Sequence, residues 1–199
     1  IPMLPMLADG LYGAPNMPVE IAGLRFTNPV GLAAGMDKSA AAVPMWERLG
    51  FGFAELGGVT RHAQSGNDAP RMFRAVADRA LVNRMGFNNP GADAMAGRLR
   101  DWHDSCAWPS HPVGINLGKS KVTPLADAPA DYRYSFRLLK NLADFFVVNV
   151  SSPNTPNLRQ LQEKSALAEI LAALQEANDS HRPILVKVAP DLGFEALDE

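Results

Sequence analysis

Short apolar runs alternate along this chain with longer amphipathic stretches, a pattern typical of β-α units. The apolar runs are almost continuously hydrophobic, which favours strands of a parallel sheet buried on both faces. We expect such strands at residues 30–34, 51–58, 112–117, 145–150 and 184–188. Helical spacing of apolar positions predicts helices at residues 40–49, 90–103, 131–142 and 167–178. A small hairpin is expected at residues 19–26, and a polar loop between the second strand and about residue 80.

Five β-α units in series fit two α/β architectures, a doubly wound sheet and a (β/α)8 TIM barrel. Both architectures place functional residues at the carboxyl ends of their strands. A complete barrel takes about 250 residues. If the fold is a barrel, the 199 residues of this chain therefore hold only about its first five units.

The composition narrows the class of protein. Apolar residues make up 47% and charged residues 20%, as in a folded globular domain, and the net charge of −2 argues against a nucleic-acid-binding surface. Cys106 is the one cysteine, so the chain cannot form an internal disulfide. No apolar run approaches the roughly 20 residues that span a bilayer. No His or Cys cluster has the spacing of metal ligands, so we expect no metal site.

Polar and small residues gather where the predicted strands end. Alanine and glycine after the first two strands let a flat ligand approach the backbone closely, and asparagines offer paired donors and acceptors for amide-like edges. The chain contains no Walker, G-x-G-x-x-G or G-x-S-x-G motif. The residues alone therefore predict a planar ligand that bears amides, of the kind that a cofactor presents.

Lys187 is a charged residue within the apolar run 184–188. One interpretation is an exposed lysine at the edge of a sheet. The other is function, because a lysine on a buried strand is costly unless it is paired. We favour function.

Four segments resemble dihydroorotate dehydrogenases. They are residues 28–38 (NPVGLAAGMDK), 83–89 (NRMGFNN), 149–155 (NVSSPNT) and 186–191 (VKVAPD), and the resemblance runs from about residue 19 to residue 191. It implies a (β/α)8 barrel that binds FMN and oxidises dihydroorotate to orotate in pyrimidine synthesis. One departure is Gly58, which stands where the family usually has Thr or Ser.

The resemblance also implies roles for single residues. Ser152 matches the catalytic base, with Thr155 and Phe87 beside the exit route of the proton, and Arg74 matches a residue of the quinone tunnel. The positions that match FMN contacts are Ala33, Ala34, Lys38, Gly58, Asn83, Asn116, Asn149 and Lys187. The positions that match substrate contacts are Lys38, Asn83, Arg84, Met85, Gly86, Phe87, Asn149 and Asn154.

The identity of the base indicates the class. Soluble relatives have Cys where this chain has Ser152, so the resemblance implies the quinone-dependent class, whose N-terminal helices lie on a membrane surface. Residues 1–18 would then be the end of that extension, and residues 19–199 a partial FMN-binding barrel. The expected location is peripheral, on the cytoplasmic face of a bacterial inner membrane or on the mitochondrial inner membrane.

Three alternatives remain. The first is a soluble, fumarate- or NAD-linked dihydroorotate dehydrogenase, which Ser152 argues against. The second is a dihydropyrimidine dehydrogenase module, which would also use Cys as its base. The third belongs to another class of protein, a non-catalytic half-barrel that binds a partner.

Overall fold

A computed structural model describes residues 16–152, 158–193 and 195 of the chain. Its centre is a five-stranded parallel sheet with the order β3-β4-β7-β8-β9. The order follows the chain in one direction, as in a barrel, whereas a doubly wound sheet reverses it. The predicted barrel topology is thereby confirmed over these five strands. The strands are β3 (Gly31–Leu32), β4 (Phe53–Val59), β7 (Val113–Leu117), β8 (Phe145–Asn149) and β9 (Ile184–Lys187).

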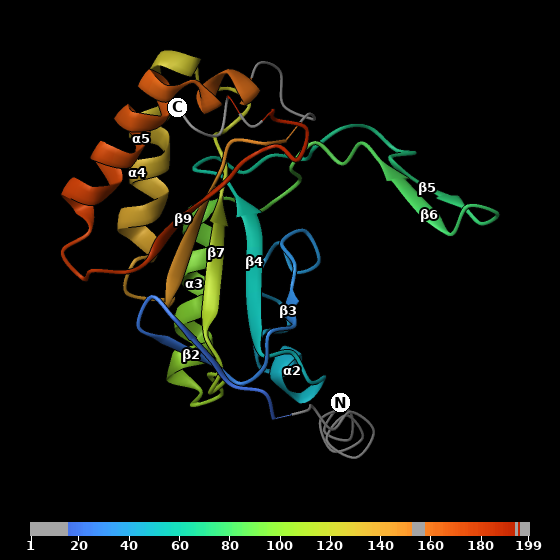
Figure 1. Ribbon diagram of the computed structural model, residues 1–199, viewed down its shortest axis with the longest axis vertical. Coiled ribbons are helices and arrows are strands. Elements are labelled where there is room, and N and C mark those ends of the chain that lie inside the picture. Colours follow the sequence, from blue (N-terminus) through green and yellow to red (C-terminus); the bar gives the residue numbers. More distant parts are fainter. Residues whose placement is uncertain (1–15, 153–157, 194, 196–199) are drawn as a thin grey trace.

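Helices follow the strands and pack mainly against one face of the sheet (Figure 1). Alternate side chains of β4, β7 and β8 point into this layer and form the hydrophobic core. Phe136 of α4, for example, meets Phe146 of β8 edge to face, with 4.8 Å between ring centroids. The helices are α2 (Val43–Arg48), α3 (Ala92–Asp104), α4 (Ala128–Leu139) and α5 (Lys164–Ala177), with 3₁₀ turns η1 (Leu125–Asp127) and η2 (Leu158–Gln162).

The first two helices begin later than the sequence predicts. Ala40 has a φ of 55°, which no α-helix contains, and α2 starts only at Val43. Gly91 has a φ of 87° directly before α3, so Pro90 lies outside the helix rather than in its first turn. A Cβ at position 91 would lie 2.8 Å from the backbone nitrogen of Ala63, which explains the glycine.

The opposite face of the sheet is apolar near the amino ends of its strands. Phe53 pairs with Gly31, and Phe145 with Gly114, and in each pair the ring fills the space that a Cβ on the glycine would need. The expected N-terminal hairpin, β1 (Val19–Ile21) with β2 (Leu24–Phe26), covers this end. The ring of Phe26 contacts Phe53 at 5.3 Å and Phe145 at 6.3 Å between centroids.

A second hairpin replaces part of the expected polar loop. Strands β5 (Met72–Ala75) and β6 (Ala80–Asn83) pair antiparallel and project away from the sheet (Figure 1). Their turn has Arg79 at a φ of 50° and contains neither Gly nor Asn, the two residues that usually mark a positive φ. Phe73 and Val82 are cross-strand partners on this arm, and both are exposed.

Strand β9 was predicted to be buried on both faces, and this is wrong. In the described chain its one strand neighbour is β8. Leu185 is 49% exposed, and Lys187 is exposed as well.

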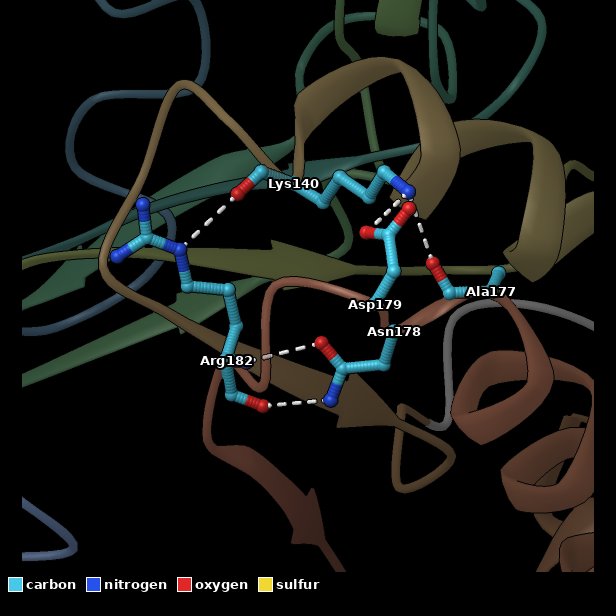
Figure 2. A network of polar contacts seen from close by, with 5 residues as sticks. All are labelled: Lys140, Ala177, Asn178, Asp179 and Arg182. Atoms are coloured by element: carbon cyan, nitrogen blue, oxygen red, sulfur yellow. Dashed lines mark hydrogen bonds and ion pairs between the residues drawn. The ribbon is translucent and has the colours of Figure 1, made fainter.

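A polar network fixes the turn that leads into β9 (Figure 2). The amide of Asn178 accepts from the backbone nitrogen of Arg182 and donates to its carbonyl, both at 2.9 Å. Lys140, directly after α4, donates to the carbonyl of Ala177 at 3.0 Å and to the carboxylate of Asp179 at 2.6 Å. Arg182 Nε donates to the carbonyl of Lys140 at 3.2 Å. The start of β9 is thus fastened to the end of α4.

Within the described residues, none of the helices has the length and apolar character that crossing a bilayer requires.

Gly114→Ala should destabilise the fold by about 1–3 kcal/mol, because its Cβ would lie 2.2 Å from the ring of Phe145 and force the aromatic cluster apart. Gly97→Ala is the matched control, since a Cβ there meets nothing within 4 Å and Gly97 lies inside α3, where alanine is favoured by about 1 kcal/mol. Urea unfolding measures both. Equal midpoints for the two variants would contradict the packing described.

Candidate active site at the carboxyl ends of the strands

The loop after β3 is fastened to the end of β4. The backbone nitrogen of Gly35 donates to the carbonyl of Gly57 at 2.7 Å, and that of Gly57 donates to the carbonyl of Asp37 at 2.9 Å. Ala33 is exposed and Ala34 half-buried at the start of this loop. The small side chains leave the backbone of this edge accessible to a flat ligand.

The buried carboxylate of Asp37 organises the same loop from below. It accepts hydrogen bonds from the backbone nitrogens of Ala41 and Ala42, at 2.8 and 3.0 Å, and from the indole of Trp46 at 3.1 Å. These bonds fix the backbone on either side of Lys38, the next residue in the chain.

Lys38 is half-buried, and its Nζ donates to Oδ1 of Asn88 at 2.7 Å. Burial lowers the pKa of Lys38 below its ordinary value, and the nearby positive charge of Arg71 lowers it further. The guanidinium of Arg71 is itself held by the carbonyls of Ser65 and Asn67, at 2.7 and 2.9 Å. Two cations therefore meet on this side of the site, where they favour an anionic ligand.

A row of hydrogen-bonded polar side chains crosses the middle of the sheet. Asn116 of β7 donates to Oε1 of Glu55 on β4 at 2.6 Å, and Asn149 of β8 donates to Oδ1 of Asn116 at 3.0 Å. Oδ1 of Asn149 accepts from the backbone nitrogen and the hydroxyl of Ser151, at 3.2 and 3.1 Å. We call these four residues, Glu55, Asn116, Asn149 and Ser151, the amide row.

Tyr132 supports the amide row from the helix side. Its hydroxyl donates to the backbone carbonyl of Asn149 at 2.9 Å, and burial raises the pKa of this tyrosine. The phenol therefore stays protonated, and remains a hydrogen-bond donor, above the ordinary tyrosine pKa of 10.0.

Phe87 forms a wall beside the amide row. Its φ is 53°, and its ring lies where a Cβ on Gly58 would be only 2.6 Å away. Asn116 Oδ1 lies 3.1 Å from the same point. Any larger side chain at position 58 would displace the ring, which gives a steric reason for glycine at this position.

Asn89 locks the loop that carries Phe87 onto the end of β4. Its Nδ2 donates to the carbonyl of Phe87 at 2.7 Å and to the hydroxyl of Thr60 at 2.9 Å. Its Oδ1 accepts from the backbone nitrogens of Thr60 and Gly91, at 3.2 and 2.9 Å. Phe87 is therefore held in place by hydrogen bonds that connect its loop to the end of β4.

Several predicted site residues meet at this edge. Asn116 and Asn149 are in direct contact, Lys187 pairs with Asn149 in the β8–β9 register, and Ser152 follows the amide row and is half-buried. Gly58 lies against the ring of Phe87, and Gly86, directly before Phe87 in the chain, has a φ of 72° and packs against Asn67.

Other predicted residues lie apart from the amide row. Arg74 and Asn83 are exposed on the projecting hairpin. Arg84, at the base of this hairpin, donates from Nε and Nη2 to the carbonyl of Pro70, at 3.2 and 3.1 Å. The backbone carbonyl of Met85 accepts from Asn67 at 3.1 Å. Asn154 and Thr155 lie outside the described residues.

Sequence reasoning missed Glu55, Arg71 and Tyr132. Glu55 had a usable signal, because it is a charged residue within the apolar run 51–58, the same signal that singled out Lys187. Tyr132 lies on an ordinary amphipathic helix, and only the fold brings its hydroxyl to Asn149. In the described chain, no group of three or more His, Cys, Asp or Glu residues could hold a metal ion.

Comparison with known proteins identifies related sequences and structures. Residues 16–199 match the sequence model of dihydroorotate dehydrogenase. A dihydroorotate dehydrogenase (quinone) of Gloeobacter violaceus is 61% identical over 194 residues, which cover 96% of this chain and 53% of that protein. One of Nostoc sp. is 62% identical over 178 residues, 89% of this chain and 46% of that protein. A crystal structure of DHODH from Eimeria tenella in complex with ferulenol has a TM-score of 0.84 at 37% identity, covering 98% of this chain and 60% of that one.

The chain therefore belongs to the dihydroorotate dehydrogenase family. Within it, the chain is a homologue of the quinone-type proteins at about 60% identity, and it spans about half the length of the curated relatives it matches.

The lowered pKa of Lys38 beside Arg71 predicts that the stability of the protein depends on pH. Because burial and like charge disfavour the ammonium form only in the folded protein, the unfolded state binds this proton more tightly. Stability should therefore rise with pH between the lowered pKa of Lys38 and its ordinary value of 10.5. Arg71→Gln should raise the pKa of Lys38 but leave it below 10.5, since burial is the larger cause.

The measurement is an NMR titration of the Lys38 side chain. Arg100→Gln, which removes an exposed arginine of α3, is the matched control and should leave the pKa unchanged. An equal pKa of Lys38 in the wild type and in Arg71→Gln would contradict the electrostatic description.

Proposed function

We propose that this chain supplies the amide row and the catalytic serine of a quinone-dependent dihydroorotate dehydrogenase, which oxidises dihydroorotate to orotate in de novo pyrimidine synthesis. One observation carries the proposal. In a chain of this family, hydrogen-bonded amides run across two central strands and end beside Ser152. This arrangement offers a planar amide ligand several directed hydrogen bonds next to a hydroxyl.

The donor set fits the FMN that the family binds. Amide side chains suit the pyrimidine-like edge of a flavin, and small residues along the sheet edge leave room for its plane. Bound FMN would supply the acceptor for the hydride removed from dihydroorotate. The residues that we expect to contact it are Ala33, Ala34, Lys38, Gly58, Asn83, Asn116, Asn149 and Lys187.

The substrate carries a carboxylate and two ring amides. Lys38, beside the charge of Arg71, suits the carboxylate, because a half-buried cation gives up less hydration when it binds an anion than a fully exposed one. Asn149 and Asn154 would bind the ring amides. Asn83, Arg84, Met85, Gly86 and Phe87 would complete the substrate pocket.

Ser152 would remove the proton from C5 of dihydroorotate as the hydride leaves C6. A serine hydroxyl is a weak base, so the proton must pass onward as it arrives. Thr155, three residues along the loop, and the wall at Phe87 would border that path. Lys187, in register with Asn149, would contribute positive charge at the end of the neighbouring strand.

The electron acceptor would be a quinone that enters beside Arg74 on the β5–β6 arm. This arm exposes Phe73, Leu81 and Val82, an apolar surface that suits a hydrophobic molecule. Residues 1–18 would form the end of a membrane-associating extension, and residues 19–199 would belong to the barrel. We accordingly propose a peripheral location on a membrane.

Ser152→Ala should slow reduction of the bound flavin by dihydroorotate by about 10²–10⁴-fold, the usual effect of losing a general base. Orotate should still bind, because the amide row is intact. Stopped-flow absorbance of the flavin is the measurement, and Ser165→Ala, an exposed serine of α5, is the control. A Ser152→Ala rate within threefold of the control would remove Ser152 from the mechanism.

The acceptor gives an independent test. Turnover with a soluble quinone should exceed turnover with fumarate or NAD, and Arg74→Ala should raise the KM for quinone without changing flavin reduction by dihydroorotate. Steady-state assays with each acceptor measure this. Faster turnover with fumarate would show the soluble class instead.

A further inference from the structure

A shallow hollow on the outer surface is lined by three arginines. It has a volume of about 490 Å3 and lies between α4 and Arg61, which comes two residues after the end of β4. Its described lining is Arg61, Ala130, Arg133, Tyr134, Arg137 and Leu138, with no acidic side chain among them. The whole chain has a net charge of −2, so this concentration of positive charge is local. We call this hollow the arginine groove.

Two of the arginines are already held in position. The guanidinium of Arg61 lies over the ring of Tyr134, 4.5 Å from its centroid. The hydroxyl of Tyr134 donates to the carboxylate of Asp93 on α3, at 3.1 Å to both oxygens. Arg133 makes only a surface ion pair with Glu176, 3.5 Å apart with side chains 40% and 77% exposed, which a competing anion can replace at little cost.

Arg137 is the third cation, and it is exposed. Among the described residues it has neither an ion pair nor a hydrogen bond. Arg133 and Arg137 are four residues apart on one helix, where like charges repel each other and weaken the helix. An anion bound between them would turn this repulsion into attraction.

We infer that the arginine groove binds a phosphate-bearing ligand with two or more negative charges, at a site separate from the proposed active site. Phosphate suits the groove better than a single carboxylate, because three guanidinium groups can each donate two parallel hydrogen bonds to phosphate oxygens. Ala130, Leu138 and the ring of Tyr134 offer apolar contacts for the carbon part of a phosphate ester. The source of the phosphate is a free metabolite or a lipid headgroup.

Pyrophosphate is the probe for a free ligand, titrated by calorimetry into the protein at low ionic strength. Arg137→Glu should weaken its binding at least tenfold. Arg100→Glu makes the same charge change at an exposed arginine of α3 outside the groove, and it should change the affinity less than twofold. Flotation with phosphatidylcholine vesicles containing phosphatidylglycerol tests the lipid source with the same variants.

Pyrophosphate binding that depends on Arg137 supports a free ligand, and vesicle binding that depends on Arg137 supports a lipid phosphate. Binding that survives Arg137→Glu, an equal loss in Arg100→Glu, or no saturable binding of either probe overturns the inference. Arg137→Gln, which is less disruptive, should show a smaller loss in the same direction. FMN retention should be equal in all variants, so failure here is distinguishable from failure of the proposed enzyme.

Discussion

The hydrogen bond between Asn149 and Asn116 is the contact on which the geometry of the candidate site depends. It joins two central strands at 3.0 Å, and both amides are buried, so each must find partners within the protein. Glu55 accepts a hydrogen bond from the amide of Asn116, and Ser151 donates one to the amide of Asn149. Tyr132 separately holds the backbone carbonyl of Asn149. A register shift of one residue in β8 would turn Asn149 towards the helices and break the amide row. The register of the sheet therefore determines where the side chains of the candidate site lie.

The amino ends of the strands carry apolar packing that stabilises the sheet, and the carboxyl ends carry the polar side chains of the candidate site. Near the amino ends, Phe53 and Phe145 lie over glycines of the neighbouring strands, and Phe26 of the N-terminal hairpin packs on both rings. Near the carboxyl ends, the same face of the sheet carries amides, a carboxylate and small residues. The apolar end can hold the strands in register while the polar end stays free to bind a ligand.

The sequence predicts the parts of the fold and site that have a local sequence pattern, and it misses those that depend on long-range contacts. The central strands were predictable because short, continuously apolar runs such as residues 145–150 are typical of strands buried on both faces of a parallel sheet. The β5–β6 arm was not, since Arg79 adopts a positive φ without the glycine or asparagine that marks such turns, and both faces of the arm are exposed. A charged residue within an apolar run predicts a buried, paired side chain at Lys187 and equally at Glu55. Lys187 is exposed in the described chain, whereas Glu55 accepts a hydrogen bond from Asn116. Long-range partners such as Tyr132 have no recognisable pattern in the sequence around them, because only the fold brings them to the site.

We propose that the amide row holds a flavin and a pyrimidine side by side. The most direct measurement is the visible absorption of the protein with FMN, recorded while orotate is added. We predict a saturable shift of the flavin bands in the wild type and at least tenfold weaker orotate binding in Asn149→Ala. A protein whose flavin spectrum does not respond to orotate, or an Asn149→Ala variant that binds orotate as the wild type does, would contradict the account.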